Sequence, residues 1–204
     1  DLVMSTQGRS FWILDDLTAL REWSASMQKE AAVMFTPQPA YRTQLSGWGA
    51  AVPAPAPKGA VLQFMLDAKP DSAKVLRIEI SDAGGKAKKI FSSKPDVSKQ
   101  ESELKASKGY NRLTWDLEFP APEITPGTIM GYGWAPGPQA APGKYNVKLS
   151  FGTTSVSKEL TVVKDPRWRA TDQDLQQQFE LSLKCREELS RIHRAIRQIR
   201  SVRT

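Results

Sequence analysis

Between Gly59 and Lys164 the chain alternates apolar and polar residues with the period of two that is typical of half-buried β-strands. In the segment 74–81, for example, Leu76, Ile78 and Ile80 share one face, which predicts that this face is buried. The same reading predicts six strands, at 60–66, 74–81, 86–92, 111–117, 144–151 and 155–163. Short strands without intervening helices predict an antiparallel, immunoglobulin-like β-sandwich.

Two aromatic residues are the expected centre of this sandwich. Trp115 lies on the same strand parity as Leu113 and Leu117, so we expect it to be buried in the core. Tyr145 begins a strand after the Pro142-Gly143 turn. We expect its ring to pack inward while its hydroxyl still reaches water.

The last segment of the chain has the pattern of a long amphipathic helix. Thr171 is placed to cap the helix, and Asp174 completes a capping box three residues later. An apolar stripe follows at spacings of mostly three and four: Leu175, Phe179, Cys185, Leu189, Ile192, Ile196, Ile199 and Val202. At about 1.5 Å per residue this helix exceeds 40 Å, which is longer than a small sandwich.

Part of the stripe must therefore meet another apolar surface. The candidates are the segment 17–27, a continuation of the chain, or a second copy of the chain. The predicted assembly face consists of Leu189, Ile192, Ile196 and Ile199. A homo-oligomer formed through this helix is accordingly one expected partner.

The chain before residue 59 contains short and dissimilar pieces. Residues 11–14 have the pattern of a short buried strand that needs a sheet from elsewhere, because four residues cannot bury themselves. Residues 17–27 show helical spacing, and alternating prolines at 51–57 predict an exposed polyproline II strut. We therefore divide the chain into an extension with a Pro-rich connector (1–58), the β-sandwich (59–164) and the C-terminal helix (165–204).

Composition narrows the function classes. The net charge of +7 comes from lysines scattered over the predicted strands and arginines at the end of the helix, which does not favour nucleic-acid binding. No apolar run is long enough for a membrane span, and the first residues lack the pattern of a signal peptide. One cysteine excludes an internal disulfide and multi-cysteine metal sites.

Convergent catalytic groups are scarce, so we predict no catalytic residue, metal site or cofactor. The single histidine, His193, is expected to be exposed beside the apolar stripe, and Cys185 to act as a small apolar residue within it. Asp16 is expected to cap the helix that follows it, and Asp116 and Glu118 to face solvent. An enzyme would instead need a carboxylate pair across a cleft, for instance Asp116 near Glu123.

Aromatic residues in Gly- and Pro-rich loops suggest a different binding class. Tyr132 and Trp134 lie within the loop from 120 to 142, and Trp48 lies before the proline strut. Exposed aromatic rings on sandwich loops can stack on sugar rings, so carbohydrate binding through these three residues is an alternative function. The other reading is that Trp134 packs against a neighbouring part of the protein.

Three separated motifs resemble one family. The segment from Thr6 to Leu17, TQGRSFWILDDL, is similar to the closing segment of the β-propeller in bacterial sialidase-like glycosyl hydrolases with BNR repeats, relatives of the sortilin propeller. The pair formed by 109–116 (GYNRLTWD) and 141–145 (APGKY) resembles the sandwich modules appended to such proteins, and 165–167 (DPR) extends the similarity.

This resemblance implies that the chain is the C-terminal region of a larger, exported bacterial protein, periplasmic or extracellular. The propeller of that protein is then the expected partner. The expected role of the chain is structural: it packs against or orients the propeller, and the repeats that carry the family name lie outside these residues. No catalytic residue is carried over to this chain.

Overall fold

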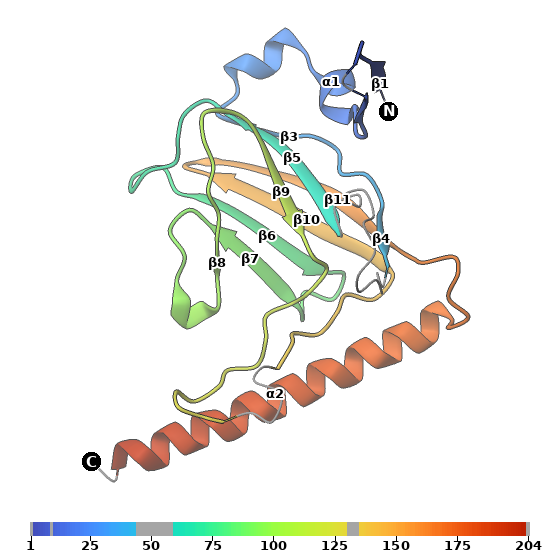
Figure 1. Cartoon of the computed structure of the whole chain (residues 1–204). Coiled ribbons are helices and arrows are strands. Elements are labelled where there is room, and N and C mark those ends of the chain that lie inside the picture. Colours follow the sequence, from blue (N-terminus) through green and yellow to red (C-terminus); the bar gives the residue numbers. More distant parts are fainter. Residues whose placement is uncertain (1, 9, 44–58, 130–134, 203–204) are drawn as a thin grey trace.

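The computed structural model describes residues 2–8, 10–43, 59–129 and 135–202. It is mainly β, with curled sheets and one long C-terminal helix (Figure 1). A two-stranded sheet and a short helical segment lie at one end, and the long helix α2 (Asp172–Val202) runs along the other (Figure 1). The two larger sheets lie between them.

Within the described residues, the two larger sheets contain nine strands. The three-stranded sheet has the order β3-β5-β9, from β3 (Ala32–Met34), β5 (Ala60–Leu66) and β9 (Gly109–Trp115). The six-stranded sheet has the order β4-β11-β10-β6-β7-β8. Its members are β4 (Ala40–Arg42), β6 (Leu76–Asp82), β7 (Lys88–Ser92), β8 (Ser102–Glu103), β10 (Gly143–Phe151) and β11 (Thr154–Lys164).

Both sheets contribute to one hydrophobic core. Leu62 and Phe64 enter it from β5, Ile78 from β6, and Val147 and Leu149 from β10, and all are buried. The predicted alternation is confirmed in β6, where Leu76, Ile78 and Ile80 are buried while the residues between them are half-buried. Apolar burial of this kind stabilises the fold by about 25 cal/mol per Å².

Strand pairing also includes segments that the sequence pattern assigned to the N-terminal extension. β3 pairs with β5, and β4 pairs with β11 in parallel. These pairings cross the predicted boundary at residue 59, so residues 32–42 are part of the β structure. The parallel pairs β4–β11 and β7–β8 also depart from the predicted all-antiparallel arrangement.

Trp115 is fully buried, as predicted, and it organises an aromatic cluster. Its ring lies 5.5 Å from that of Phe119 and 5.7 Å from that of Tyr145, both nearly edge-on. Its indole Nε1 donates to the backbone oxygen of Glu118 at 2.9 Å. Tyr145 differs from the prediction, because its hydroxyl is buried and donates to the Ala141 carbonyl at 2.7 Å instead of reaching water.

Burial of Tyr145 predicts a loss of stability in alkali. Desolvation raises the pKa of its hydroxyl to about 12. The neutral form is therefore favoured in the folded state, and its stabilising contribution is complete below pH 10 and is lost as the pH rises towards 12. The loss is about 2–3 kcal/mol. Urea unfolding from pH 8 to 12 measures it, and in Tyr145→Phe we expect this part of the pH dependence to disappear.

Helix α2 begins as the sequence predicts. The Thr171 backbone nitrogen donates to Asp174 Oδ2 at 2.8 Å, and the Asp174 nitrogen donates back to Thr171 Oγ1 at 3.1 Å. Leu175 and Phe179 in the first turns are then buried, and Phe179 belongs to the hydrophobic core. The Phe179 ring lies 5.5 Å from that of Phe119, which joins the helix to the aromatic cluster.

Candidate functional site

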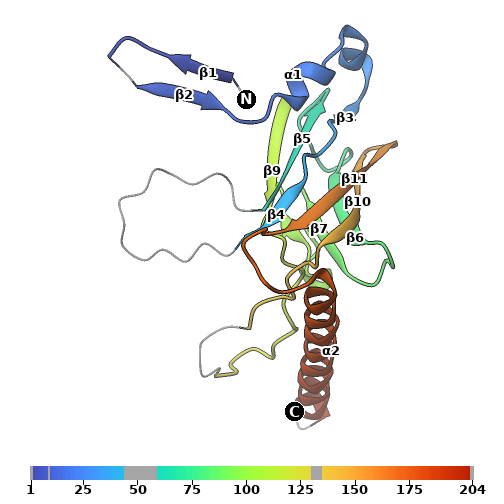
Figure 2. The ribbon, with the colours of Figure 1, turned by 90° about the vertical axis from the view of Figure 1, so that its right-hand side faces the viewer.

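The first candidate surface is the hairpin formed by β1 (Leu2–Ser5) and β2 (Phe11–Leu14). The strands pair antiparallel, with Val3 opposite Ile13 and Met4 opposite Trp12. Thr6 closes the turn, because its nitrogen and its hydroxyl both donate to the Ser10 carbonyl. Figure 2 shows the hairpin projecting beside the larger sheets as a separate ribbon.

Every described apolar side chain of this hairpin is exposed. The exposed fractions are 48–72% for Leu2, Val3, Met4, Phe11, Trp12, Ile13 and Leu14. Because successive strand residues point to opposite faces, both faces of the hairpin are apolar. The segment 11–14 forms a strand, as predicted, and it pairs with β1, a strand that was not predicted. Within this chain it is exposed, and the sheet that it was expected to need from elsewhere is not supplied by the described residues.

An exposed, apolar, two-stranded sheet is marginally stable by itself, and strands that are apolar on both faces usually lie between two other layers.

The base of the β1–β2 hairpin is attached to the remainder of the protein through Asp16. That carboxylate accepts a hydrogen bond from the Thr18 nitrogen, at the start of α1 (Thr18–Glu22), and another from Gln63 Nε2 on β5. The predicted capping role of Asp16 is not found, because the N-cap residue of α1 is Leu17 and no side chain caps the helix; Asp16 instead bonds the nitrogen of the first helical residue.

The second candidate surface is the outer face of α2. Ile192 and Ile199 are 53% and 68% exposed, while Leu189 and Ile196 are half-buried. Leu181 and Val202 are exposed on the same side. Cys185, which was predicted to lie within this apolar stripe, is exposed as well.

The predicted apolar stripe does not stay on the buried face of α2. A straight helix has 3.6 residues per turn, so residues spaced by three and four shift gradually around its axis. From Leu175 to His193 is 18 residues, about five full turns, so His193 points in the same direction as Leu175. Ile192, one residue earlier, points about 100° away. The inner face consequently changes from Leu175 and Phe179 to Ser190 and His193 along the helix.

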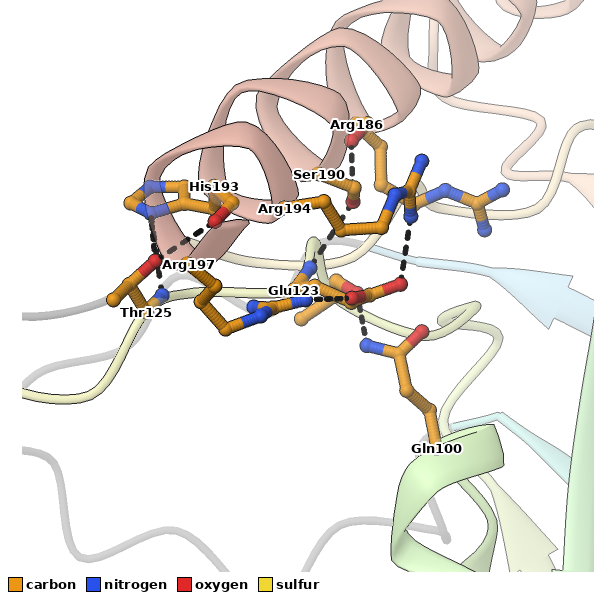
Figure 3. Close-up of polar contacts among 9 residues, drawn as sticks. Gln100, Glu123, Thr125, Arg186, Ser190, His193, Arg194 and Arg197 are labelled. Carbon is orange, nitrogen blue, oxygen red and sulfur yellow. Dashed lines mark hydrogen bonds and ion pairs between the residues drawn. The ribbon is translucent and has the colours of Figure 1, made fainter. Parts of the chain in front are cut away.

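The inner face of the C-terminal half is held by polar contacts with the segment 119–129 (Figure 3). The Glu123 nitrogen donates to Ser190 Oγ at 3.1 Å, and the Thr125 nitrogen donates to His193 Nδ1 at 3.2 Å. The Thr125 hydroxyl donates to the His193 carbonyl at 3.1 Å. His193 is only 5% exposed, so its predicted exposure is wrong.

Glu123 links the same segment to the basic end of α2. Its carboxylate accepts from Arg194 Nη1 at 2.7 Å and from Arg197 Nη2 at 2.5 Å. These hydrogen bonds, that from Arg197 foremost, lower the pKa of Glu123. The ionised form of Glu123 is therefore stabilised, and its carboxylate links the segment 119–129 to the basic end of α2.

Loss of the His193 contact is expected to weaken this end of the helix. In His193→Ala the buried Thr125 nitrogen loses its acceptor, which costs about 1–3 kcal/mol. The free energy of unfolding in urea measures this cost. Arg191→Ala, on the exposed side of the helix, is the matched control and we expect it to change stability by less than about 0.5 kcal/mol. Equal losses of unfolding free energy in the two variants would contradict a stabilising role for the contact between Thr125 and His193.

Asp116 is the other carboxylate considered for catalysis. Asp116 is exposed and accepts from the Glu118 nitrogen at 3.0 Å, as expected for a residue on the outer face. Within the described residues, no group of three or more His, Cys, Asp and Glu side chains is arranged to hold a metal ion. The loop aromatics proposed for carbohydrate binding, Tyr132, Trp134 and Trp48, lie outside the described residues.

Two further findings concern membrane crossing and similarity to known proteins. Among the described helices, none combines the length and the apolar character that crossing a membrane requires. Comparison of the chain with family models, with curated proteins and with solved structures finds no match.

Proposed function

We propose that this chain is a non-catalytic accessory module of a larger exported protein, and that it packs against a β-propeller domain of that protein through the β1–β2 hairpin. The single observation that carries the proposal is the exposure of all seven apolar side chains of the hairpin, on both faces. A propeller blade lies between two neighbouring blades, so a strand pair that is apolar on both faces suits that environment.

Further support comes from how the hairpin is attached. Asp16 connects its base to β5 and α1, which in turn continue into the larger sheets. A hairpin inserted into a propeller would therefore fix the orientation of the β region relative to it. In this proposal the β region is an immunoglobulin-like sandwich, which agrees with two sheets around one core. The proposed location is periplasmic or extracellular.

The test is binding between this chain and the propeller region of its parent protein, each produced separately. Titration calorimetry is expected to show saturable binding with a negative heat-capacity change, because apolar surface is buried. A double variant, Phe11→Ser with Trp12→Ser, is expected to abolish binding. The matched control is Tyr41→Ser, which changes an exposed aromatic residue on β4. Unchanged binding in the double variant would overturn the proposal.

Assembly through α2 is a second candidate, favoured by its exposed outer face. Ile192 and Ile199 lie on a surface that no described residue covers completely, and half-buried Leu189 and Ile196 adjoin them. Pairing of two such faces across a two-fold axis would bury them in the manner of a coiled coil.

Light scattering at several concentrations tests this second candidate. We expect a dimer that Ile192→Asp dissociates. Gln198→Asp places the same charge on an exposed position that points about 120° away from Ile192 around the helix axis, and it should leave the mass unchanged. A monomer at every concentration would remove self-assembly as a function and leave the hairpin proposal unaffected.

A further inference from the structure

Arg42 is a buried cation at the junction of four segments. It lies on β4, and its side chain is covered so completely that only 4% of the residue is exposed. Its Nε donates to Gln139 Oε1 at 3.1 Å, and its Nη2 donates to Gln178 Oε1 on α2 at 2.7 Å. The guanidinium carbon lies 5.8 Å from the centre of the Trp168 ring.

The charge of Arg42 is not compensated by any acid among the described residues. Both of its hydrogen-bond partners are neutral amides, and its third nitrogen, Nη1, is buried without a partner in the described part of the chain. Burial lowers the pKa of Arg42, but an arginine remains protonated in proteins. A buried charge without a counter-ion is unfavourable, so the site is one in which an anion would be stabilised.

A cavity lies against this guanidinium. It has a volume of about 480 Å³, and its lining includes Arg42, Gln139, Arg167, Trp168, Arg169 and Gln178. Three arginines and no acidic residue are among its described lining residues, so the cavity is positively charged. Its volume is within the range of small-molecule sites.

The charge balance favours a ligand with a single negative charge. Arg167 is already neutralised, because Asp165 accepts from its Nε at 2.9 Å and from its Nη2 at 2.5 Å. This contact lowers the pKa of Asp165 to about 2, so the carboxylate is ionised at neutral pH. Arg169, the third arginine of the lining, is exposed, so solvent screens its charge. Arg42 is therefore the buried cation of the cavity that lacks a counter-charge, and one negative charge would balance it.

We propose that this cavity binds a carboxylate, with the guanidinium of Arg42 as the main contact and Trp168 as the flat apolar wall beside it. Two edges of the guanidinium are occupied by Gln139 and Gln178. Nη1 has no partner among the described residues and is buried, so a ligand reaches it only when the side chains over it shift. The planar guanidinium donates to carboxylates and phosphates alike, and the preference for a carboxylate rests on its single negative charge. This site is independent of the hairpin and of the outer face of α2, so it adds a ligand-binding role to the proposed function.

The experiment is a titration of the ¹⁵N-labelled chain with sodium benzoate, followed by NMR and matched in ionic strength with sodium chloride. We expect saturable shifts of the Trp168 indole signal and of the side-chain signals of Arg42, Gln139 and Gln178. Sodium phosphate and a terminally blocked glutamate are titrated in parallel. Tighter binding of benzoate assigns the site to free acids, and tighter binding of the blocked glutamate assigns it to side chains of polypeptides.

Variants separate ligand binding from a structural role. Arg42→Met keeps the apolar stem and is expected to lose at least about tenfold in affinity for the carboxylate. Arg42→Lys retains the charge without the planar fork and should also bind more weakly. The control Arg112→Met removes an exposed arginine on β9 and should leave binding unchanged. If Arg42→Met does not fold, the Arg42→Lys and wild-type titrations decide the result.

Three results would overturn the proposal: shifts no different from those with chloride, equal affinities in wild type and Arg42→Lys, or saturable binding of phosphate without binding of either carboxylate. A stability measurement adds an independent readout. Without ligand, we expect folded Arg42→Met to unfold at a temperature no lower than wild type, because it removes a buried uncompensated charge. A midpoint well below that of wild type would show that Arg42 serves the fold instead.

Discussion

Replacing Trp115 by alanine is expected to lower the free energy of unfolding by about 3–5 kcal/mol. The indole is fully buried and contacts the rings of Phe119 and Tyr145. Its removal leaves a cavity between the two larger sheets and also frees the Glu118 carbonyl from its donor. Urea unfolding followed by circular dichroism measures the loss.

The chain contains a matched control for this substitution. Trp12→Ala removes the same side chain from the hairpin, where Trp12 is exposed, and we expect a change below about 0.5 kcal/mol. Trp115→Phe tests the aromatic contacts separately, because it keeps a ring but loses the hydrogen bond to Glu118. Comparable losses in Trp115→Ala and Trp12→Ala would contradict the assignment of the core.

Replacing Phe179 by alanine is expected to cost a similar amount, about 3–5 kcal/mol, and to loosen helix α2. Phe179 is buried, and its ring lies 5.5 Å from that of Phe119, so it is the main apolar contact between the helix and the aromatic cluster. Urea unfolding measures the loss of stability, and limited proteolysis reports whether α2 becomes cleavable before the sheets unfold.

The control for Phe179 is Ile192→Ala on the outer face of the same helix. Ile192 is exposed in the single chain, so its truncation should change the stability of a monomer by less than about 0.5 kcal/mol. Proteolysis of α2 at the wild-type rate in Phe179→Ala would show that the polar contacts of Ser190 and His193 hold the helix without the aromatic contact.

Strand periodicity predicted most of the β structure because it depends on local alternation and burial. The six predicted strands correspond to β5, β6, β7, β9, β10 and β11, with ends that differ by up to two residues. β3 and β4 are three residues each, too short to show alternation, and their pairing depends on contacts with distant strands. The capping box of α2 was predictable because Thr171 and Asp174 are neighbours in the sequence.

Other features depended on information that a local pattern does not contain. The stripe on α2 has nearly regular spacing, but the rotation of a straight helix over several turns places His193, and not Ile192, against the segment 119–129. The apolar residues of β1 flank the same turn as those of β2, a hairpin signal that the sequence analysis did not use.

Arg42 could not be recognised from the sequence at all. A single arginine after an extended segment is ordinarily exposed. Its burial results from β4 pairing with β11 and from the approach of Gln139 and Gln178, which are 97 and 136 residues away along the chain. Only the assembled fold places an uncompensated cation beside a cavity.

Hydrogen exchange of the isolated chain tests most directly whether the β1–β2 hairpin is a docking element. We predict that the amides of Phe11–Leu14 exchange rapidly in the isolated chain, while those of Leu76–Asp82 in the core strand β6 exchange slowly. In the proposed longer protein with a propeller domain, both sets should exchange slowly. Protection of the hairpin in the isolated chain equal to that of β6 would contradict the account, because the hairpin would then need no partner.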